Sequence, residues 1–575
     1  MALNAARRVT RADGRGQSAR SFARHTDRFA RRQIQPGVLR SPRDGRRPVL
    51  DSVFSRHRPT EGCASEVDFV ASLSLEFDRL EMPIAPEERP SRAARARASA
   101  PSALSTATNS QLALHLPSEL PSLEIEPEWK DQQRLWGHSF HPMCSYLASF
   151  PASLAHAFIA RYTRPGDVVL DPFSGRGTTP LQACAEGRVG AGNDLNPFAH
   201  ILTGAKVDPP TKADVKIRLA TLHLAWVASS GEWNALADRI VADPGSDVLV
   251  PAPGSRPISG TPTDRSASGS IPVRPDTSVP AEVALAFHPR TLAQLLYLRA
   301  GLDPDDRTDR FLLATLTGIL HGKSASYLSA VMPNTFSMAP RYVRDFVART
   351  GFHSPERDAF DLLEDKLRRL YRQPPPTTRG IALLGDARDA GVRFREALHD
   401  RGLPERARLV VSSPPYLRVV KYGYYNWLRL WLLGYDASAI DDLLDDAHHH
   451  DAYIVFMREV LSGLRSALAD DAVIALVIGD VEMDRGRPAA GGVGLAESVW
   501  EMAAAPEGYR LAGIALDDVA AGRKMTKLWG DEAGQATKLD RILILATSEA
   551  GRRRAINGAS LPIDWDWPPR RPRAL

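Results

Sequence analysis

The first candidate for a functional site is a short motif that combines an acid, two glycines and two threonines. The motif reads Asp171-Pro-Phe-Ser-Gly175-Arg-Gly177-Thr178-Thr179 and follows the apolar run Val-Val-Leu. Gly175 and Gly177 lack a Cβ atom, so a ligand can approach the backbone closely where the chain leaves a strand. A helix that starts after the glycines would direct its free N–H groups at an anionic group. We expect a ligand-binding turn here, and an ordinary tight turn is the alternative.

Two further acids point to a nucleoside as the ligand. Asp194 ends the next apolar run, where an acid can accept hydrogen bonds from two ribose hydroxyls, and a helix N-cap is the alternative. The dinucleotide fingerprint needs a third glycine where Pro180 stands, and the Gly-Lys-Ser/Thr of a phosphate loop is absent. An adenosyl amino acid fits better, with its carboxylate bound by Thr178 and Thr179. Asp386 follows a later apolar run and could accept a hydrogen bond from an adenine amino group.

A second motif, Ser413-Pro414-Pro415-Tyr416, ends another apolar run. Its two prolines make the backbone rigid and cannot continue a central β-ladder. The hydroxyl of Ser413 and the carbonyl of Pro414 would both be free acceptors, while Tyr416 offers a ring for stacking. Such a set suits a planar group that carries an amino function. A simple strand-ending turn is the alternative.

Three other polar or aromatic clusters have simpler explanations. Residues 421–427, Lys-Tyr-Gly-Tyr-Tyr-Asn-Trp, could stack on nucleic acid, but the leucines that follow favour a packed helix. Arg523, Lys524 and Lys527 could contact phosphates or simply be solvated. Residues 448–451, His-His-His-Asp, cannot all face one ion on a regular element, so we expect a solvated loop and no metal site.

Seven apolar runs, most of them separated by helical patterns, must position these motifs. Strands that alternate with helices predict an α/β fold: a doubly wound, mostly parallel, seven-stranded sheet with helices on both faces. The runs lie at residues 167–171, 188–194, 381–384, 408–412, 472–478, 509–516 and 540–547. Ligands of open parallel sheets bind at the carboxyl ends of the strands, beside the switch in strand order. Both motifs should therefore meet at that edge of the sheet.

The spacing between the second and third runs is too long for one crossover, so an insertion is expected there. It shows helical patterns at 212–228, 290–302 and 310–322, and its Pro/Ser/Gly-rich stretch at 242–282 predicts a loop. This mainly helical insertion is our first candidate for a target-recognition region. The expected organisation is a disordered segment at 1–125, two parts of one α/β domain at 126–209 and 381–550, the insertion at 210–380 and a tail at 551–575.

The charge of the chain is concentrated at its start. Residues 1–50 contain 13 Arg and 3 Asp, with no Lys or Glu, whereas the other 525 residues carry 60 basic and 65 acidic side chains. The net charge of +5 therefore does not argue that the body binds nucleic acid. We favour a basic tail that binds phosphates without sequence preference, and a mitochondrial transit peptide or a misassigned start codon are alternatives.

Composition excludes several protein classes. No stretch of about 20 apolar residues occurs, so no membrane-spanning helix is expected. The three cysteines, Cys63, Cys144 and Cys184, are far apart and form no CxxC pair, which excludes a disulfide scaffold and a cysteine-based zinc site. A reducing, cytoplasmic setting is the expectation.

Together, the strings DPFSGRGTT and SSPPY resemble the amino-group DNA methyltransferases, which methylate cytosine N4 or adenine N6 with S-adenosylmethionine. The similarity covers about residues 137–209 and 380–548, and residues 141–151 resemble the element that precedes a helix beside the cofactor in that family. Many family members place Ser-Pro-Pro-Tyr before the cofactor motif, whereas here it follows. The resemblance implies an unpermuted, Rossmann-like methyltransferase sheet.

The resemblance also assigns roles to individual residues. The cofactor-binding set that it implies is Asp171, Phe173, Gly175, Gly177, Thr178, Asp194 and Asp386, and the catalytic loop is Ser413, Pro414, Pro415 and Tyr416. The implied reaction is in-line attack of an exocyclic amine on the sulfonium methyl. Acceptors at Ser413 and Pro414 would localise the amine lone pair, and a flipped base would stack on Tyr416.

Serine rather than aspartate at position 413 favours cytosine N4 as the target. Methylation at cytosine C5 needs a nucleophilic cysteine, typically in a Pro-Cys pair. None of the three cysteines follows a proline, so this mechanism is excluded. An adenine-N6 enzyme, an enzyme acting on an RNA guanine amino group, and an inactive DNA-binding protein with this fold are the alternatives. DNA is the expected partner, no membrane partner is expected, and a cognate restriction endonuclease is a further candidate.

Overall fold

The computed structural model describes residues 121–566 except for 134, 148, 247, 252, 255–275, 335, 416–421, 444–449, 480–493 and 518–539. These residues all belong to one unit of the chain, Glu66–Leu575. Of the positions singled out above, Tyr416, Lys421, Arg523, Lys524 and Lys527 lie outside the described residues, as do residues 1–120.

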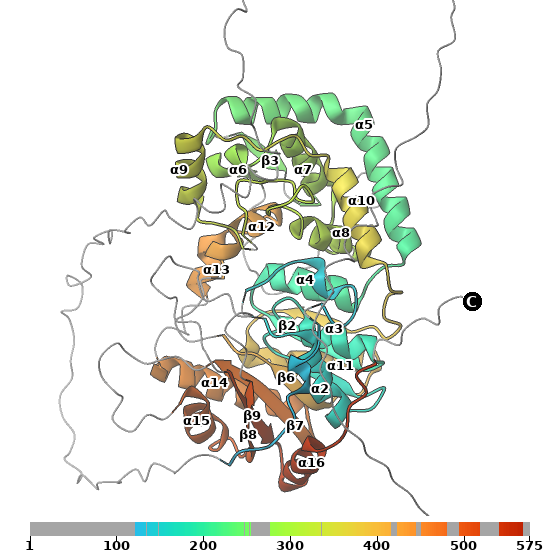
Figure 1. The fold of residues 1–575 in the computed structure, drawn as a ribbon, viewed down its shortest axis with the longest axis vertical. Coiled ribbons are helices and arrows are strands. Elements are labelled where there is room, and N and C mark those ends of the chain that lie inside the picture. Colours follow the sequence, from blue (N-terminus) through green and yellow to red (C-terminus); the bar gives the residue numbers. More distant parts are fainter. Residues whose placement is uncertain are drawn as a thin grey trace, which may run out of the picture. The chain divides into compact units, whose positions relative to one another are not determined.

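A seven-stranded sheet forms the centre of the α/β part (Figure 1). Its strands are β1 (Val168–Asp171), β2 (Val189–Asp194), β5 (Ile381–Leu384), β6 (Ala407–Ser412), β7 (Leu468–Gly479), β8 (Arg510–Asp517) and β9 (Asp540–Ala546). They lie in the order β5-β2-β1-β6-β7-β9-β8, and β9 runs antiparallel to both of its neighbours. The predicted doubly wound, mostly parallel sheet is confirmed, and each observed strand overlaps one predicted run.

Alternating side chains of the strands build a core on each face of the sheet. In β1, Val168 and Leu170 belong to one buried cluster and Val169 to the other. The first cluster includes α11 (Ala390–Asp400) and α14 (His450–Leu464), and the second includes α2 (Ala152–Tyr162) and α16 (Glu549–Ala559). Two further helices, α3 (Thr178–Ala185) and α4 (Pro197–Val207), follow β1 and β2 along the chain.

Residues 212–370 form most of the insertion, and the described part of it is mainly helical (Figure 1). Its helices are α5 (Lys212–Ala242), α6 (Ala281–Ala286), α7 (Pro289–Gly301), α8 (Arg307–Thr317), α9 (Pro340–Thr350) and α10 (Ala359–Leu370). A small antiparallel pair, β3 (Leu249–Pro251) and β4 (Asp276–Ser278), lies within the stretch that we expected to be a loop.

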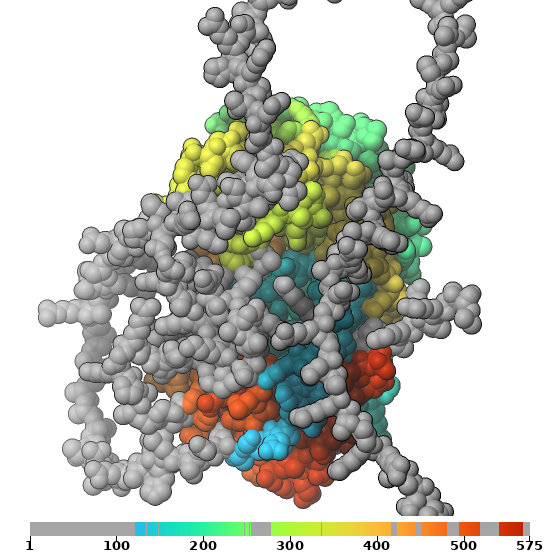
Figure 2. Space-filling model, in the orientation of Figure 1, coloured from blue at the N-terminus to red at the C-terminus, as the bar shows by residue number. Residues whose placement is uncertain are grey.

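The insertion shares its core with the α/β part. One buried cluster contains Leu202 of α4, Leu313 of α8 and Leu430 of α12 (Trp427–Leu432). In the space-filling view, the teal surface of the first α/β segment lies directly beside the green and yellow surface of the insertion (Figure 2). The insertion therefore packs directly against α4 and does not form a separate domain with its own core.

Several short elements complete the described structure. They are the 3-10 helices η1 (Glu128–Lys130), η2 (His141–Met143), η3 (Ala387–Asp389), η4 (Tyr424–Asn426) and η6 (Arg465–Ala467), the α-helices α13 (Ala437–Leu443) and α15 (Leu495–Ser498), and the π-helix η7 (Val499–Ala504). Within the described part of the chain, no helix is both long and apolar enough to span a bilayer.

The expected tail at 551–575 instead begins inside a helix. Ala555 and Ala559 of α16 are buried against the sheet, and Gly558 lies so close to Tyr162 that an added Cβ would be 2.4 Å from its ring. Arg554 donates to the carbonyl oxygens of Tyr162, Arg408 and Asp471. The basic composition hid this helix, because small residues rather than large apolar ones form its contact face.

Glycine in β2 allows α3 to lie directly on the sheet. A Cβ on Gly190 would be 2.0 Å from the carbonyl oxygen of Pro180, whereas a Cβ on Gly231 of α5 would meet no atom within 4 Å. We predict that Gly190→Ala lowers the free energy of unfolding by about 1–3 kcal/mol, because α3 must move away from β2. Gly231→Ala, the matched control, should raise it by up to ~1 kcal/mol. Urea unfolding followed by circular dichroism measures both, and equal stability of the two variants would contradict this packing.

Candidate active site

The switch in strand order places the two sequence motifs side by side. β1 pairs with β2 on one side and with β6 on the other, all in parallel. The loops that follow β1 and β6 therefore leave the same edge of the sheet and open into one hollow with an empty volume of about 980 Å³. The predicted residues that line it are Asp171, Phe173, Gly175, Thr178, Asp194, Asp386, Ser413 and Pro415. Gly177 and Pro414 do not line it, and Tyr416 lies outside the described residues.

Both glycines of the first loop have left-handed backbone conformations. Gly175 has φ +48° and Gly177 has φ +73°, and residues that carry a Cβ atom rarely adopt such positive φ angles. A Cβ on Gly177 would lie 2.8 Å from the Thr203 hydroxyl, and a Cβ on Gly175 would touch the ring of Tyr146 at 3.4 Å. Gly177 thus shapes the turn against α4, while Gly175 presents its backbone to the hollow. The alternative of an ordinary tight turn does not account for this lining.

Asp171 connects the two loops. Its Oδ1 accepts hydrogen bonds from the Ser412 hydroxyl at 2.6 Å and from the Phe173 N–H at 3.2 Å. The side chain is buried, and this burial raises the pKa of Asp171 to about 7, although the Ser412 hydrogen bond opposes the change. Asp171 therefore titrates near neutrality, and a cation in the hollow would favour its charged form.

Asp194 holds the glycine turn in place. Its two carboxylate oxygens accept from the N–H groups of Gly175 at 2.8 Å and Asn196 at 2.9 Å. Burial raises the pKa of Asp194 to about 6. The N-cap of α4 is Asn196, which accepts from the Phe198 N–H, so the helix-cap alternative for Asp194 is wrong. Asp194 also lines the hollow, where its carboxylate can accept a hydrogen bond from a ligand hydroxyl.

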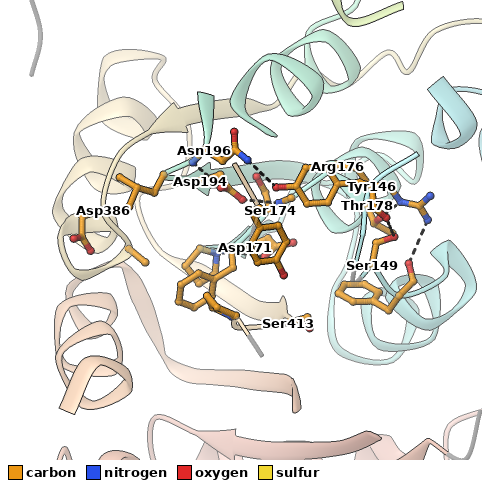
Figure 3. A pocket seen from close by; sticks show the side chains of 18 of the residues that line it. Tyr146, Ser149, Asp171, Ser174, Arg176, Thr178, Asp194, Asn196, Asp386 and Ser413 are labelled. Atoms are coloured by element: carbon orange, nitrogen blue, oxygen red, sulfur yellow. Dashed lines mark hydrogen bonds between the residues drawn. The ribbon is translucent and has the colours of Figure 1, made fainter. Parts of the chain in front are cut away.

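Asp386 lies at one end of the hollow, with Asp171 and Asp194 between it and the other end (Figure 3). Asp386 caps η3 by accepting from the Arg388 N–H at 2.9 Å, and it also pairs with the Arg388 guanidinium at 2.8 Å. The Arg388 guanidinium lies over the ring of Phe456, 5.0 Å from its centroid. This end therefore combines a paired carboxylate with an aromatic surface.

Ser413 enters the hollow from β6. Its hydroxyl donates to the carbonyl oxygen of Val477 on β7 at 3.2 Å. Because the single hydroxyl proton is used in this bond, the Ser413 oxygen can only accept from a ligand in this arrangement. Pro414 is buried behind it, and Pro415 lines the hollow. An acceptor role for Ser413 stays a prediction.

Two tyrosines that the sequence analysis did not assign also line the hollow. Tyr146 follows η2 and receives a hydrogen bond from Asn196 at 3.3 Å, while Tyr422 stacks on it with ring centroids 5.9 Å apart. The position of Tyr146 agrees with the expected place of residues 141–151 beside the ligand. Tyr425 and Trp427 are buried in the core, which confirms a packed helix for that part of residues 421–427.

The first threonine of the motif lines the hollow, but the second does not. Thr179 is fully buried and donates to the carbonyl oxygen of Val411, so the expectation that it binds a carboxylate is wrong. Thr178 lines the hollow and accepts a hydrogen bond from Arg176. Arg176 is thus a lining residue that the sequence analysis missed, although its place between the two motif glycines was a usable signal.

No metal centre is evident in this part of the chain. Among the described residues, no group of three or more His, Cys, Asp or Glu could hold a metal ion. His450 and Asp451 begin α14, and the remainder of the His-rich stretch lies outside the described residues.

Known proteins are similar to the part of the chain that contains the first loop. A DNA methylase family model matches residues 53–203, a segment that includes Asp171 and Asp194 and ends before Ser413. The type II methyltransferase M.Cfr9I of Citrobacter freundii is 36% identical over 70 residues, which are 12% of this chain and 23% of that protein. M.MjaII of Methanocaldococcus jannaschii is 34% identical over 70 residues, 12% of this chain and 13% of its own. The chain thus aligns with less than a quarter of the length of these relatives.

A solved structure is also similar. It is the rRNA methyltransferase aviRa from Streptomyces viridochromogenes, with 12% identity, 76% of this chain and 97% of that chain covered, and a TM-score of 0.24. The resemblance to the amino-group DNA methyltransferases is confirmed by the family model and the type II relatives, and this family uses S-adenosylmethionine.

The lining of the hollow fits that cofactor. Carboxylates at Asp194 and Asp386 suit ribose hydroxyls and an adenine amino group, and Asp171 suits a cationic group.

The pKa of Asp171 makes a prediction about stability. Because the pKa is about 7 in the folded protein against an ordinary 3.8, the unliganded protein should lose stability progressively as pH rises from about 4 through 7. Asp171→Asn keeps an acceptor for Ser412 but removes the charge. We predict that its stability relative to the native protein rises over that interval by up to ~4 kcal/mol. Thermal unfolding across this pH range measures the difference, and a difference independent of pH would contradict the assignment.

Proposed function

We propose that this chain is a DNA methyltransferase that transfers a methyl group from S-adenosylmethionine to an exocyclic amino group of a flipped base, cytosine N4. One observation carries the proposal: Gly175 of the cofactor motif and Ser413 of the second motif line the same hollow. A methyl donor against the first loop and an amine against the second would then be neighbours. In-line displacement depends mainly on this positioning.

The donor side of the hollow is built from three carboxylates. We assign the ribose hydroxyls to Asp194, which is held by the N–H groups of Gly175 and Asn196. Asp386 would accept a hydrogen bond from the adenine amino group. Phe456 lies at the same end of the hollow, and Phe173 packs against its ring. Asp171 would pair with the ammonium of the amino-acid part. When bound, the donor supplies an electrophilic methyl group on a sulfonium.

The acceptor side depends on Ser413. An exocyclic amine is a poor nucleophile because its lone pair is conjugated with the ring. The Ser413 oxygen, whose own proton is bound by the Val477 carbonyl, would accept one amine hydrogen. The carbonyl of Pro414, a residue that does not line the hollow, would accept the other once it turns towards the amine. These bonds would localise the lone pair and direct it at the methyl. The nitrogen–carbon bond would form as the sulfur–carbon bond breaks, with the bonding pair left on the sulfur of a neutral thioether, and the methylated amine would lose its extra proton to solvent water.

The target must leave the base stack, because its amine is inaccessible inside a duplex. We propose that Tyr416 stacks on the flipped base. Among the described residues, Tyr422 stacks on Tyr146 in the lining of the hollow. Serine at 413 favours cytosine N4. We propose DNA as the partner and the cytoplasm as the location. Because the relatives are type II methyltransferases, we also propose a cognate restriction endonuclease as a partner.

A nucleoside assay tests the function. The full chain is incubated with labelled S-adenosylmethionine and with DNA or RNA, and the modified nucleoside is identified by mass spectrometry. N4-methylcytosine in DNA supports the proposal. N6-methyladenine would replace the proposed target, and a modified guanine in RNA would replace both target and substrate. Cofactor binding without transfer to any nucleic acid would favour an inactive DNA-binding protein.

We predict that Ser413→Ala lowers turnover about 100-fold or more while cofactor affinity stays within about threefold, because only the amine loses a partner. Ser466→Ala is the matched control: its hydroxyl also donates to a carbonyl at 3.2 Å, that of Gly463, but it does not line the hollow. That control should keep full turnover. Equal loss of cofactor affinity and turnover in Ser413→Ala would remove the proposed role.

A further inference from the structure

Arg176 brings a guanidinium group to the hollow at the end opposite Asp386 (Figure 3). Its Nε donates to the Thr178 hydroxyl at 3.2 Å, and its Nη2 donates to the Phe150 carbonyl at 3.4 Å. Among the described residues, no carboxylate lies within ion-pair distance of this guanidinium, whereas Arg388 at the other end pairs with Asp386 and Glu459. Both hydrogen bonds of Arg176 go to neutral oxygens, so its charge is not compensated there.

A second cation lies behind Arg176. Lys206 of α4 is fully buried, and its Nζ donates to the main-chain carbonyl of Arg176 at 2.6 Å. Burial and then the nearby charge of Arg176 lower the pKa of Lys206 well below its usual value. The three lining carboxylates lie elsewhere, because Asp171 and Asp194 occupy the middle of the hollow and Asp386 its far end (Figure 3). The charged groups of the hollow are therefore separated: the carboxylates lie in the middle and at one end, and the guanidinium of Arg176 lies at the other end.

Helix α3 begins at the basic end, and its first residue, Thr178, lines the hollow. Gly177, the N-cap, offers no side-chain hydrogen bond, so the first N–H groups of the helix are not capped by it. Thr178 accepts from Arg176 and so keeps its own proton to donate. A guanidinium, a hydroxyl and a helix N-terminus together suit a small planar anion such as a carboxylate.

We infer that Arg176, with the Thr178 hydroxyl, binds the carboxylate of the methyl donor's amino-acid end. The inference rests on the proposed function, which supplies an adenosyl amino acid as the ligand. It also orients the ligand: the ammonium pairs with Asp171 in the middle of the hollow, and the carboxylate lies beyond it at Arg176. Arg176 is thereby a specificity residue, because it rejects adenosyl compounds that lack the carboxylate.

A thermodynamic cycle isolates this contact. The ligands are S-adenosylhomocysteine and the corresponding thioether without its carboxylate, each titrated calorimetrically into the full chain. The proteins are the native chain, Arg176→Met and Arg176→Gln, where Gln retains a hydrogen-bonding side chain without charge. We expect the native protein to prefer the carboxylate ligand by about 10- to 100-fold and Arg176→Met to reduce that preference to about threefold or less. Arg176→Gln should fall close to Arg176→Met, because the charge is the main contribution.

Arg388→Met is the matched control, because it also removes a cation that lines the hollow. Arg388 lies at the Asp386 end, so its loss should change the affinities of both ligands by the same factor. A preference that survives in both Arg176 variants overturns the inference, as does a native protein that binds the two ligands equally. If the native protein binds neither ligand, the proposed function and the inference both fail. If it binds both ligands without the expected preference, only the inference fails. If Arg176→Met does not fold, shown by the loss of its unfolding transition, Arg176→Gln decides the result.

Discussion

The candidate site depends on a hydrogen bond between two strand ends. Asp171 is the last residue of β1 and Ser412 the last residue of β6, and the Ser412 hydroxyl donates to the Asp171 carboxylate at 2.6 Å. Each is followed at once by one of the two loops that line the hollow. This bond therefore fixes the spacing between the glycine turn and Ser413. The carboxylate is buried, so its ionisation costs free energy. Functional sites often contain such destabilising groups, because the reaction or the ligand requires the charge.

Elements from distant parts of the chain complete the same hollow. Tyr146 reaches it from the segment before α2 and covers Gly175, and Tyr422 stacks on Tyr146 from the segment before α12. The end of that second segment is held by Asp441 of α13, which accepts from the N–H groups of Gly423 and Tyr424. The walls of the hollow thus depend on the packing of the insertion as well as on the sheet, because α12 belongs to the core that the insertion shares with α4.

Charge is distributed along the hollow in a way that matches a zwitterionic nucleoside. Carboxylates occupy one end and the middle, and the guanidinium of Arg176 occupies the other end. Burial raises the pKa of both Asp171 and Asp194, so each carboxylate is stabilised when a donor or a cation arrives. A ligand with an ammonium and a carboxylate on one carbon would satisfy both signs of charge within a short distance.

The sequence alone determined the seven strands, their doubly wound arrangement and most lining residues of the two motifs, because strand periodicity and the glycine and proline positions are local signals. It could not show that Thr179 points away from the hollow to Val411, that Asn196 rather than Asp194 caps α4, or that residues 549–559 form a helix on the sheet. It also missed Arg176, which lines the hollow and forms its side-chain hydrogen bonds with the neutral oxygens of Thr178 and Phe150. Such facts depend on which side chains the packed chain brings together, and that is decided by contacts between residues far apart in the sequence.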